Sequence, residues 1–292
     1  MKQILTLVVG LLLVPQPDAA RVLADVRQAL GGDAAIAAVQ AFSVTGTQAT
    51  NLDGRTAGAD IEWICALPDR FIRTRRIGTP FGTDVDTVGF SADARIRRRD
   101  SDLPAPPDPF EHDTPDQRAE RDRRAVLTLK HEFSRLAVAL VGLPAVDPLD
   151  ATYEGRRDID GGSADVVQLG SSDGYSARLF VDASTHLPLM VSWMAAPIVV
   201  VSSSARVAVP AGQSPNTIPL PVPVVPRGDP TAGRAPVEHQ LWFEDFKISD
   251  GLTWPHRFVE KVDGHVWQTT SMGKYKLNPK IDPKQFDPSR RP

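Results

Sequence analysis

Polar and apolar residues alternate with a period of two along most of this chain, which predicts a protein built mainly of β-strands. The clearest alternation lies in residues 238–286, where two turn signals, Ser249-Asp250-Gly251 and Asp263-Gly264, separate three runs. Such runs and turns are typical of an antiparallel meander. Pro279 and Pro283 end the pattern, because proline cannot donate to a sheet. The region holds three of the five tryptophans, so it is expected to cover or line a large apolar volume.

Two earlier groups of runs show the same alternation. The predicted strands are 42–50, 56–66, 71–77, 84–90 and 94–99 in the first group, and 151–158, 164–169, 175–181 and 187–193 in the second. Consecutive runs are separated by short turns such as Leu67-Pro68-Asp69, and strands joined in this way pair antiparallel.

Three segments show helical spacing instead. Residues 20–30 place Val22, Val26 and Leu30 on one face, and 34–39 form a short second helix that Asp33 can cap. The longest pattern is 116–140, which is charged all round in its first half and amphipathic in its second. This helix is expected to lie over a concave sheet, or alternatively to plug the end of a sandwich.

Three segments of the chain follow neither the strand nor the helix pattern. Residues 1–20 read as a secretory signal peptide, with Lys2, an apolar core of eleven residues and cleavage near Ala19 or Ala20. That core is shorter than the about 20 residues that span a bilayer. Residues 196–236 form a proline-rich insertion, interpreted either as a long loop or hairpin projecting from the sheet or as disordered. Residues 100–116 are expected to form an exposed loop.

Composition narrows the class of protein. A net charge of −3 with 24% charged residues argues against nucleic acid as the main partner. The single cysteine, Cys65, excludes an internal disulfide and is expected to pack as a small apolar residue. With a cleaved signal peptide and no cysteine at its end, the mature protein is expected to be free in the periplasm, as a monomer and as a single domain over residues 21–292.

No catalytic signature is present in the sequence. It contains no Gly-x-Ser-x-Gly, His-Glu-x-x-His, phosphate-binding glycine loop or paired-cysteine motif. Among the histidines, only His239, His256 and His265 could meet across strands, and they are expected to be structural or exposed. Glu244 and Asp245 are expected to face solvent. We therefore predict no enzyme, no metal and no cofactor, and a hydrolase or metal-dependent enzyme is the least favoured alternative.

Several short motifs, taken in order, resemble the periplasmic lipoprotein carriers and the wider family of outer-membrane lipoprotein-sorting-like proteins. They are Leu67-Pro68-Asp69-Arg70-Phe71-Ile72-Arg73, Leu179-Phe180-Val181-Asp182, Leu187-Pro188, Phe243-Glu244-Asp245-Phe246 with Gly251-Leu252 and Pro255, and Asn278-Pro279 with Ile281-Asp282 and Phe286. The resemblance spans residues 21–287 and is that of a distant relative. The chain departs from the carrier at Leu67, where the carrier has a basic residue, and in its proline-rich insertion.

The resemblance implies an incomplete antiparallel β-barrel whose concave face is covered by the N-terminal and middle helices. It implies a non-enzymatic carrier of a lipid or an acylated protein, and the alternative is an envelope protein–protein interaction module without cargo. Aromatic side chains could line an apolar groove or simply be core beneath a helix. The groove candidates are Trp63, Phe71, Phe133, Phe243, Trp254, Phe258 and Trp267. Arg73 and Arg75 are candidates for a ligand headgroup, or lie on a solvated edge.

Overall fold

The computed structural model describes residues 18–52, 54–80, 82–102, 110–142, 150–160, 162–198 and 233–290 of the 292-residue chain. Its strands form one 13-stranded antiparallel sheet. The strands of the first half of the chain are β1 (Ala41–Leu52), β2 (Arg55–Ala66), β3 (Arg70–Thr79), β4 (Gly82–Ser91) and β5 (Ala94–Ser101). Those of the second half are β6 (Asp150–Ile159), β7 (Gly162–Gly170), β8 (Ser176–Asp182), β9 (Pro188–Ala195), β10 (Val237–Ser249), β11 (Leu252–Val262), β12 (His265–Met272) and β13 (Lys276–Leu277).

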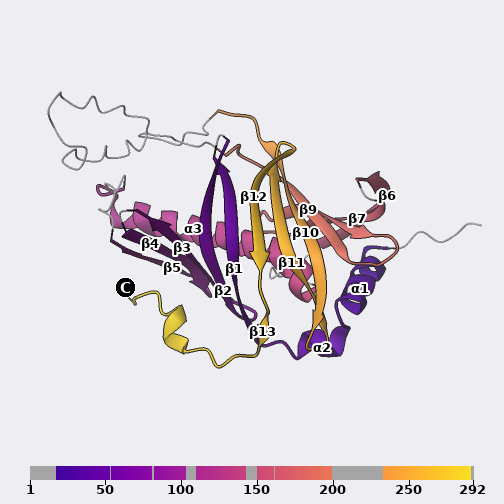
Figure 1. Ribbon diagram of the computed structural model, residues 1–292. Coiled ribbons are helices and arrows are strands. Elements are labelled where there is room, and N and C mark those ends of the chain that lie inside the picture. The colour runs from indigo at the N-terminus through magenta and orange to yellow at the C-terminus, as the bar shows by residue number, and fades with distance from the viewer. Residues whose placement is uncertain are drawn as a thin grey trace, which may run out of the picture.

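The order of the strands divides the sheet into two wings that meet in the middle (Figure 1). The order is β5-β4-β3-β2-β1-β12-β11-β10-β9-β8-β7-β6, and β13 pairs with β1. Within each wing, neighbours in sequence are neighbours in space, so most pairs are hairpins. The junction is the β1–β12 pair, where Gly46 lies opposite Met272. A Cβ at Gly46 would lie 2.1 Å from the carbonyl oxygen of Ser271, so this close approach requires glycine.

The chain passes from one edge of the sheet to the other through α3 (Pro115–Val141), which runs behind the sheet in Figure 1. The helix contacts β4 and β5 in one wing and β9 and β11 in the other. One helix reaches both wings because the sheet curves around it. The described parts of β5 and β6 are not paired with each other, so the barrel is open. The fold class expected from the sequence, an incomplete antiparallel barrel with helices over its concave face, is confirmed.

Local sequence sets the ends of α3. Thr114 and Gln117 form a reciprocal capping box at its start, and Pro115 occupies the first turn. Gly142 ends the helix in the left-handed conformation, with a φ of 66°. A Cβ there would lie 2.7 Å from Cγ of Arg27, so glycine also allows the N-terminal helix to approach.

The N-terminal helices close one end of the concave face. Helix α1 (Ala19–Ala29), capped by Asp18, buries Val22 and Val26 and contacts β6 and β7. Helix α2 (Asp33–Ala37) follows it. Both helices were predicted to within a few residues. The predicted signal peptide lies mostly outside the described residues, as do most of the 196–236 insertion and part of the 100–116 loop.

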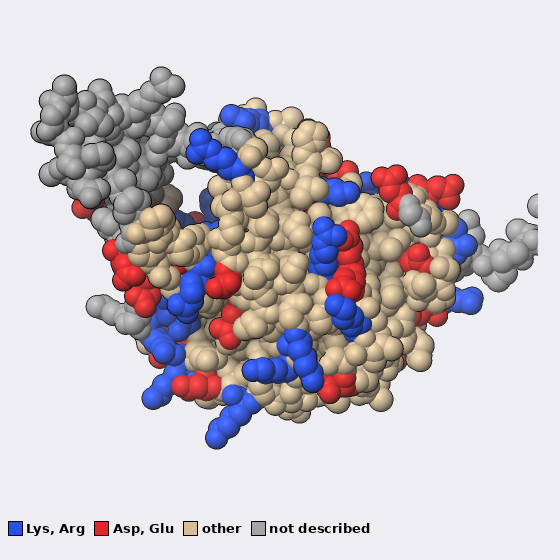
Figure 2. Space-filling model, viewed as in Figure 1, with Lys and Arg blue, Asp and Glu red and all other residues tan. Residues whose placement is uncertain are grey.

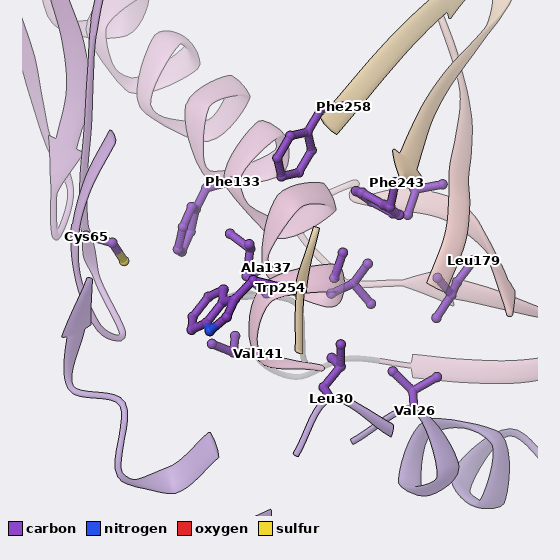
Figure 3. Close-up of a cluster of buried hydrophobic side chains, with 14 of the residues drawn as sticks. Val26, Leu30, Cys65, Phe133, Ala137, Val141, Leu179, Phe243, Trp254 and Phe258 are labelled. Atoms are coloured by element: carbon purple, nitrogen blue, oxygen red, sulfur yellow. The ribbon is translucent and has the colours of Figure 1, made fainter. Parts of the chain in front are cut away.

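The main core fills the space between α3, α1 and the concave face (Figure 3). In this view Phe133, Ala137 and Val141 of α3 point toward Trp254, while Val26 and Leu30 approach from the N-terminal side. Cys65 belongs to the same cluster and is fully buried, and burial raises the pKa of its thiol well above the ordinary range. The expectation that Cys65 packs as a small apolar residue is confirmed.

A smaller cluster lies on the outer face, beneath the C-terminal segment. Phe286, in the short 3-10 helix η2 (Pro283–Phe286), packs with Ile64, Ile72 and Ile96. Figure 2, which views the molecule from this side, shows acidic and basic side chains interspersed over a largely uncharged surface. Residues 278–290, the C-terminal strap, therefore lie across the outer face of the sheet.

Candidate ligand cavity

A cavity of about 490 Å³ lies between the middle of α3 and the concave face of the sheet. Strands from both wings line it, namely β1, β2 and β3 from one side and β9, β10, β11 and β12 from the other. It occurs where the two halves of the chain meet beneath the helix, a usual place for a ligand site in a curved sheet.

The inner wall of the cavity is apolar. Trp63 on β2 and Phe258 on β11 contact edge to face, with ring centroids 5.1 Å apart. Ile61, Leu241 and Leu136 extend this wall, and Trp193 and Ala195 add apolar surface from β9. The indole nitrogen of Trp63 is buried and, in the described part of the chain, has no hydrogen-bond partner. This wall can accept hydrocarbon.

The remaining lining is polar, and most of its charges lie close to an opposite or polar group. Arg73 of β3 lies 3.7 Å from the carboxylate of Glu132 on α3. Nδ1 of His239 lies 3.8 Å from the Glu260 carboxylate, and its Nε2 lies 3.1 Å from the carbonyl oxygen of Ala196. These contacts tie α3 and the ends of β9 and β10 to the cavity rim.

Arg135 of α3 differs from the other charged residues of the lining. Its guanidinium lies over the Trp193 ring, 4.2 Å from the centroid, and 5.9 Å from the Tyr175 ring. Trp193 in turn stacks on His239, with centroids 5.4 Å apart. Nε of Arg135 is buried without a hydrogen-bond partner among the described residues, and burial lowers the pKa of the side chain.

His131 lies one turn before Arg135 and also faces the cavity. Its Nε2 lies 3.3 Å from Oδ1 of Asp173, without the geometry of a hydrogen bond, and the two form an ion pair only when the histidine is protonated. Burial lowers the pKa of His131, and the Asp173 charge opposes that shift. The histidine is therefore mainly neutral near pH 7, because its ordinary pKa of about 6.5 is already below that value.

A smaller cavity of about 190 Å³ adjoins the first along β3 and β4. The two share Gln48, Arg73 and Gln268 in their lining, and the smaller one adds Arg75 and Asp86. Phe71, Arg73 and Arg75 alternate on β3 and so share the concave face. The two candidate headgroup arginines are thus neighbours at the same part of the concave surface.

The structure separates the seven aromatic candidates into three groups. Trp63 and Phe258 line the cavity. Four others lie in the buried core outside that lining, and Trp267 is half-buried at the register shift between β11 and β12 and is not part of the lining. The four core residues are Phe71, Phe133, Phe243 and Trp254.

Sequence reasoning did not single out Arg135, Trp193 or Leu241. Arg135 had a recognisable signal, since it is a charged residue within the amphipathic half of the long helix, next to apolar Leu136. Trp193 ends a run that was predicted as a strand, but alternation alone does not show which face of that strand meets the helix.

The described residues were also compared with the requirements of a metal site, of paired catalytic carboxylates and of a membrane-spanning helix. No group of three or more histidine, cysteine, aspartate or glutamate side chains there is placed to hold a metal ion. Glu244 pairs with Arg257 at 2.7 Å, and Asp245 pairs with Lys247 at 2.7 Å, both on the surface. None of the described helices has both the length and the apolar character needed to cross a bilayer.

No family model matches the sequence, and no curated protein matches it at a significant level. Several solved structures are similar over nearly the whole chain, among them the following three. A LolA superfamily protein from Nitrosomonas europaea is 12% identical, and the match covers 93% of this chain and 98% of that one with a TM-score of 0.46. A DUF1329 family protein from Desulfovibrio piger is 9% identical, with coverages of 93% and 98% and a TM-score of 0.48. A putative outer membrane lipoprotein-sorting protein domain from Vibrio parahaemolyticus is 8% identical, with coverages of 91% and 94% and a TM-score of 0.44.

Because the identities are 8–12% and the TM-scores lie below 0.5, the function is argued from the cavity itself.

Proposed function

We propose that this protein is a non-enzymatic periplasmic carrier that holds the acyl chain of a lipid or of an acylated protein in the cavity beneath α3. The observation that carries the proposal is the cavity of about 490 Å³, with an apolar wall at Trp63 and Phe258 and a polar rim. Cavities of roughly 300–1,000 Å³ with a few placed polar groups are typical of sites for one small ligand.

The energetics of the apolar wall fit a hydrocarbon ligand. Burying ten methylenes returns on the order of 8 kcal/mol, at about 0.8 kcal/mol each. Association itself costs about 4–15 kcal/mol, so apolar burial alone gives at most weak binding. The polar rim is expected to contribute the remaining free energy of binding. The curved sheet and α3 keep the acyl chain of the ligand out of water.

Ala195, at the end of β9, offers a way to test occupancy. It lies in the cavity lining and is half-buried, so Ala195→Trp is expected to fill the cavity without replacing a core residue. The matched control is Met194→Trp, because Met194 is the adjacent residue of β9 and is 64% exposed. Both variants add a tryptophan to the same strand.

The first measurement is native mass spectrometry of the mature protein, purified gently from an envelope fraction, with lipid extraction in parallel. A bound species with the mass of an acylated molecule is expected in the wild type and in Met194→Trp, and not in Ala195→Trp. The second measurement is quenching of tryptophan fluorescence by a brominated fatty acid. Because Trp63 lies in the cavity wall, saturable quenching is expected in the wild type and in Met194→Trp, and not in Ala195→Trp.

The alternative function is docking of an envelope protein without a lipid cargo. In that case the wild type carries no acylated species, the brominated fatty acid gives no saturable quenching, and Ala195→Trp behaves as the wild type does. That combination would overturn the carrier proposal.

A further inference from the structure

Arg135 is a cation that faces the cavity and has no ion-pair partner in the part of the chain that the structure describes. Among the described residues, no hydrogen bond and no ion pair involves its side chain, and its Nε is fully buried. The two carboxylates of the lining have nearer contacts, Glu132 with Arg73 at 3.7 Å and Glu260 with His239 at 3.8 Å. Both act on Arg135 only at longer range.

A guanidinium in this position stays charged. Burial lowers its pKa, and Tyr175, Glu132 and Glu260 oppose that change. The guanidinium of arginine remains protonated in proteins near neutral pH. A partly buried charge costs free energy unless it is paired, and stacking on Trp193 at 4.2 Å offsets only part of that cost. The site therefore favours the arrival of an anion.

The position of Arg135 also fixes how an amphiphile would lie. Leu136, the next residue of α3, belongs to the apolar wall together with Trp63 and Phe258. A ligand whose head meets the guanidinium thus has its hydrocarbon directed along that wall. The planar fork of donors on arginine matches the two oxygens of a carboxylate or a phosphate.

We propose that Arg135 is the specificity-determining residue of the cavity and selects amphiphiles that carry an anionic headgroup, a carboxylate or a phosphate, over neutral ones. This inference rests on the proposed carrier function and names the class of ligand at the same site. Trp193 acts as a positioning residue, since its ring holds the guanidinium against the rim.

Three amphiphiles with the same hydrocarbon chain test the proposal: dodecanoate, dodecyl phosphate and monododecanoylglycerol. Their dissociation constants are measured near neutral pH by tryptophan fluorescence, below the concentrations at which they form micelles. The wild type is expected to bind at least one anionic ligand about tenfold more tightly than the neutral ester, as expected for a charge-assisted hydrogen bond. The difference between dodecanoate and dodecyl phosphate identifies which headgroup the site prefers.

Two variants test the residue itself. Arg135→Gln is expected to lose the about tenfold preference while its affinity for monododecanoylglycerol changes by less than about twofold. Arg135→Lys retains the charge and is expected to restore part of the preference. Arg124→Gln is the matched control, because Arg124 lies on the same helix, is exposed and pairs with Glu120. It is expected to bind all three ligands as the wild type does.

Thermal unfolding separates this role from a structural one. Replacing an unpaired, partly buried cation by glutamine is expected to leave the melting temperature unchanged or to raise it. Equal affinities for charged and neutral ligands in the wild type, or an anion preference that survives in Arg135→Gln, would overturn the inference and leave the carrier function standing. Failure of all three ligands to bind would overturn both.

Discussion

The ring of Phe133 on α3 stacks on the ring of Phe71 on β3, with centroids 4.8 Å apart and an interplanar angle of 27°. Phe90 on β4 lies against the same helix residue, 6.0 Å from its ring. This contact anchors the helix to the first wing of the sheet. It also shows why the cavity is limited in size, since these rings fill the concave face beside it.

Phe133→Ala is expected to lower the free energy of unfolding by about 3–5 kcal/mol. Phe133 is fully buried, so its removal loses the transfer free energy of the ring and leaves a void between α3 and the sheet. Urea denaturation followed by circular dichroism measures the change. Leu127→Ala is the control on the same helix, because Leu127 is 36% exposed, and it is expected to cost less than about 1 kcal/mol. Equal losses in the two variants would show that the stack does not anchor the helix.

The strand pattern predicted most of this fold. Alternation located every strand from β1 to β12 within a few residues, because most of these strands bury one face more than the other. The segment 116–140 predicted α3 from the amphipathic pattern of its second half, most of whose apolar residues are buried in the structure. Alternation could not predict the pairing of β1 with β12, because it joins residues more than two hundred positions apart and no turn signal marks it.

The division of the aromatic residues between core and cavity could not be read from alternation. Phe71 and Arg73 share a face of β3, yet the first is core and the second lines the cavity. The difference is set by where α3 crosses the strand, which depends on the pairing of both wings. Trp267 has no partner on β11, because Glu260 pairs with Gln268 and Lys261 with Val266, so regular alternation does not hold at this residue.

The pH dependence of stability is expected to include a contribution from Asp182. Hydrogen bonds from the Ser184 hydroxyl, together with the backbone amides of Ser184 and Thr185, hold the pKa of the Asp182 carboxyl at about 2, below its ordinary 3.8. A lowered pKa in the folded state stabilises the protein above the unfolded value, and that stabilisation is lost as the pH falls toward about 2.

Asp182→Ala is therefore expected to cost about 1 kcal/mol at neutral pH, the usual value for a side chain that caps backbone amides. The cost is expected to shrink as the pH is lowered from 3.8 toward about 2, where the wild-type carboxyl becomes protonated. Urea denaturation at several pH values measures it. Asp158→Ala removes an exposed carboxyl from β6 and is expected to show no such trend. A cost for Asp182→Ala that is independent of pH would contradict this account of the turn.

Asn278 fastens the C-terminal strap to the start of β1. Its Oδ1 accepts hydrogen bonds from the backbone amides of Gln40 at 2.8 Å and Ala41 at 3.0 Å, and its Nδ2 donates to the carbonyl oxygen of Ala38 at 2.9 Å. The residue also has a positive φ of 45°, a conformation that asparagine tolerates better than most residues.

Two substitutions of Asn278 separate these contributions. Asn278→Gly keeps the backbone conformation and removes the three hydrogen bonds, so it is expected to cost about 1–2 kcal/mol. Asn278→Ala also strains the backbone and is expected to cost about 1 kcal/mol more. Urea denaturation measures both, and Lys280→Ala, an exposed position two residues further along, serves as the control. If alanine and glycine cost the same, the positive φ contributes nothing; if neither lowers the free energy of unfolding, the side chain does not fasten the strap.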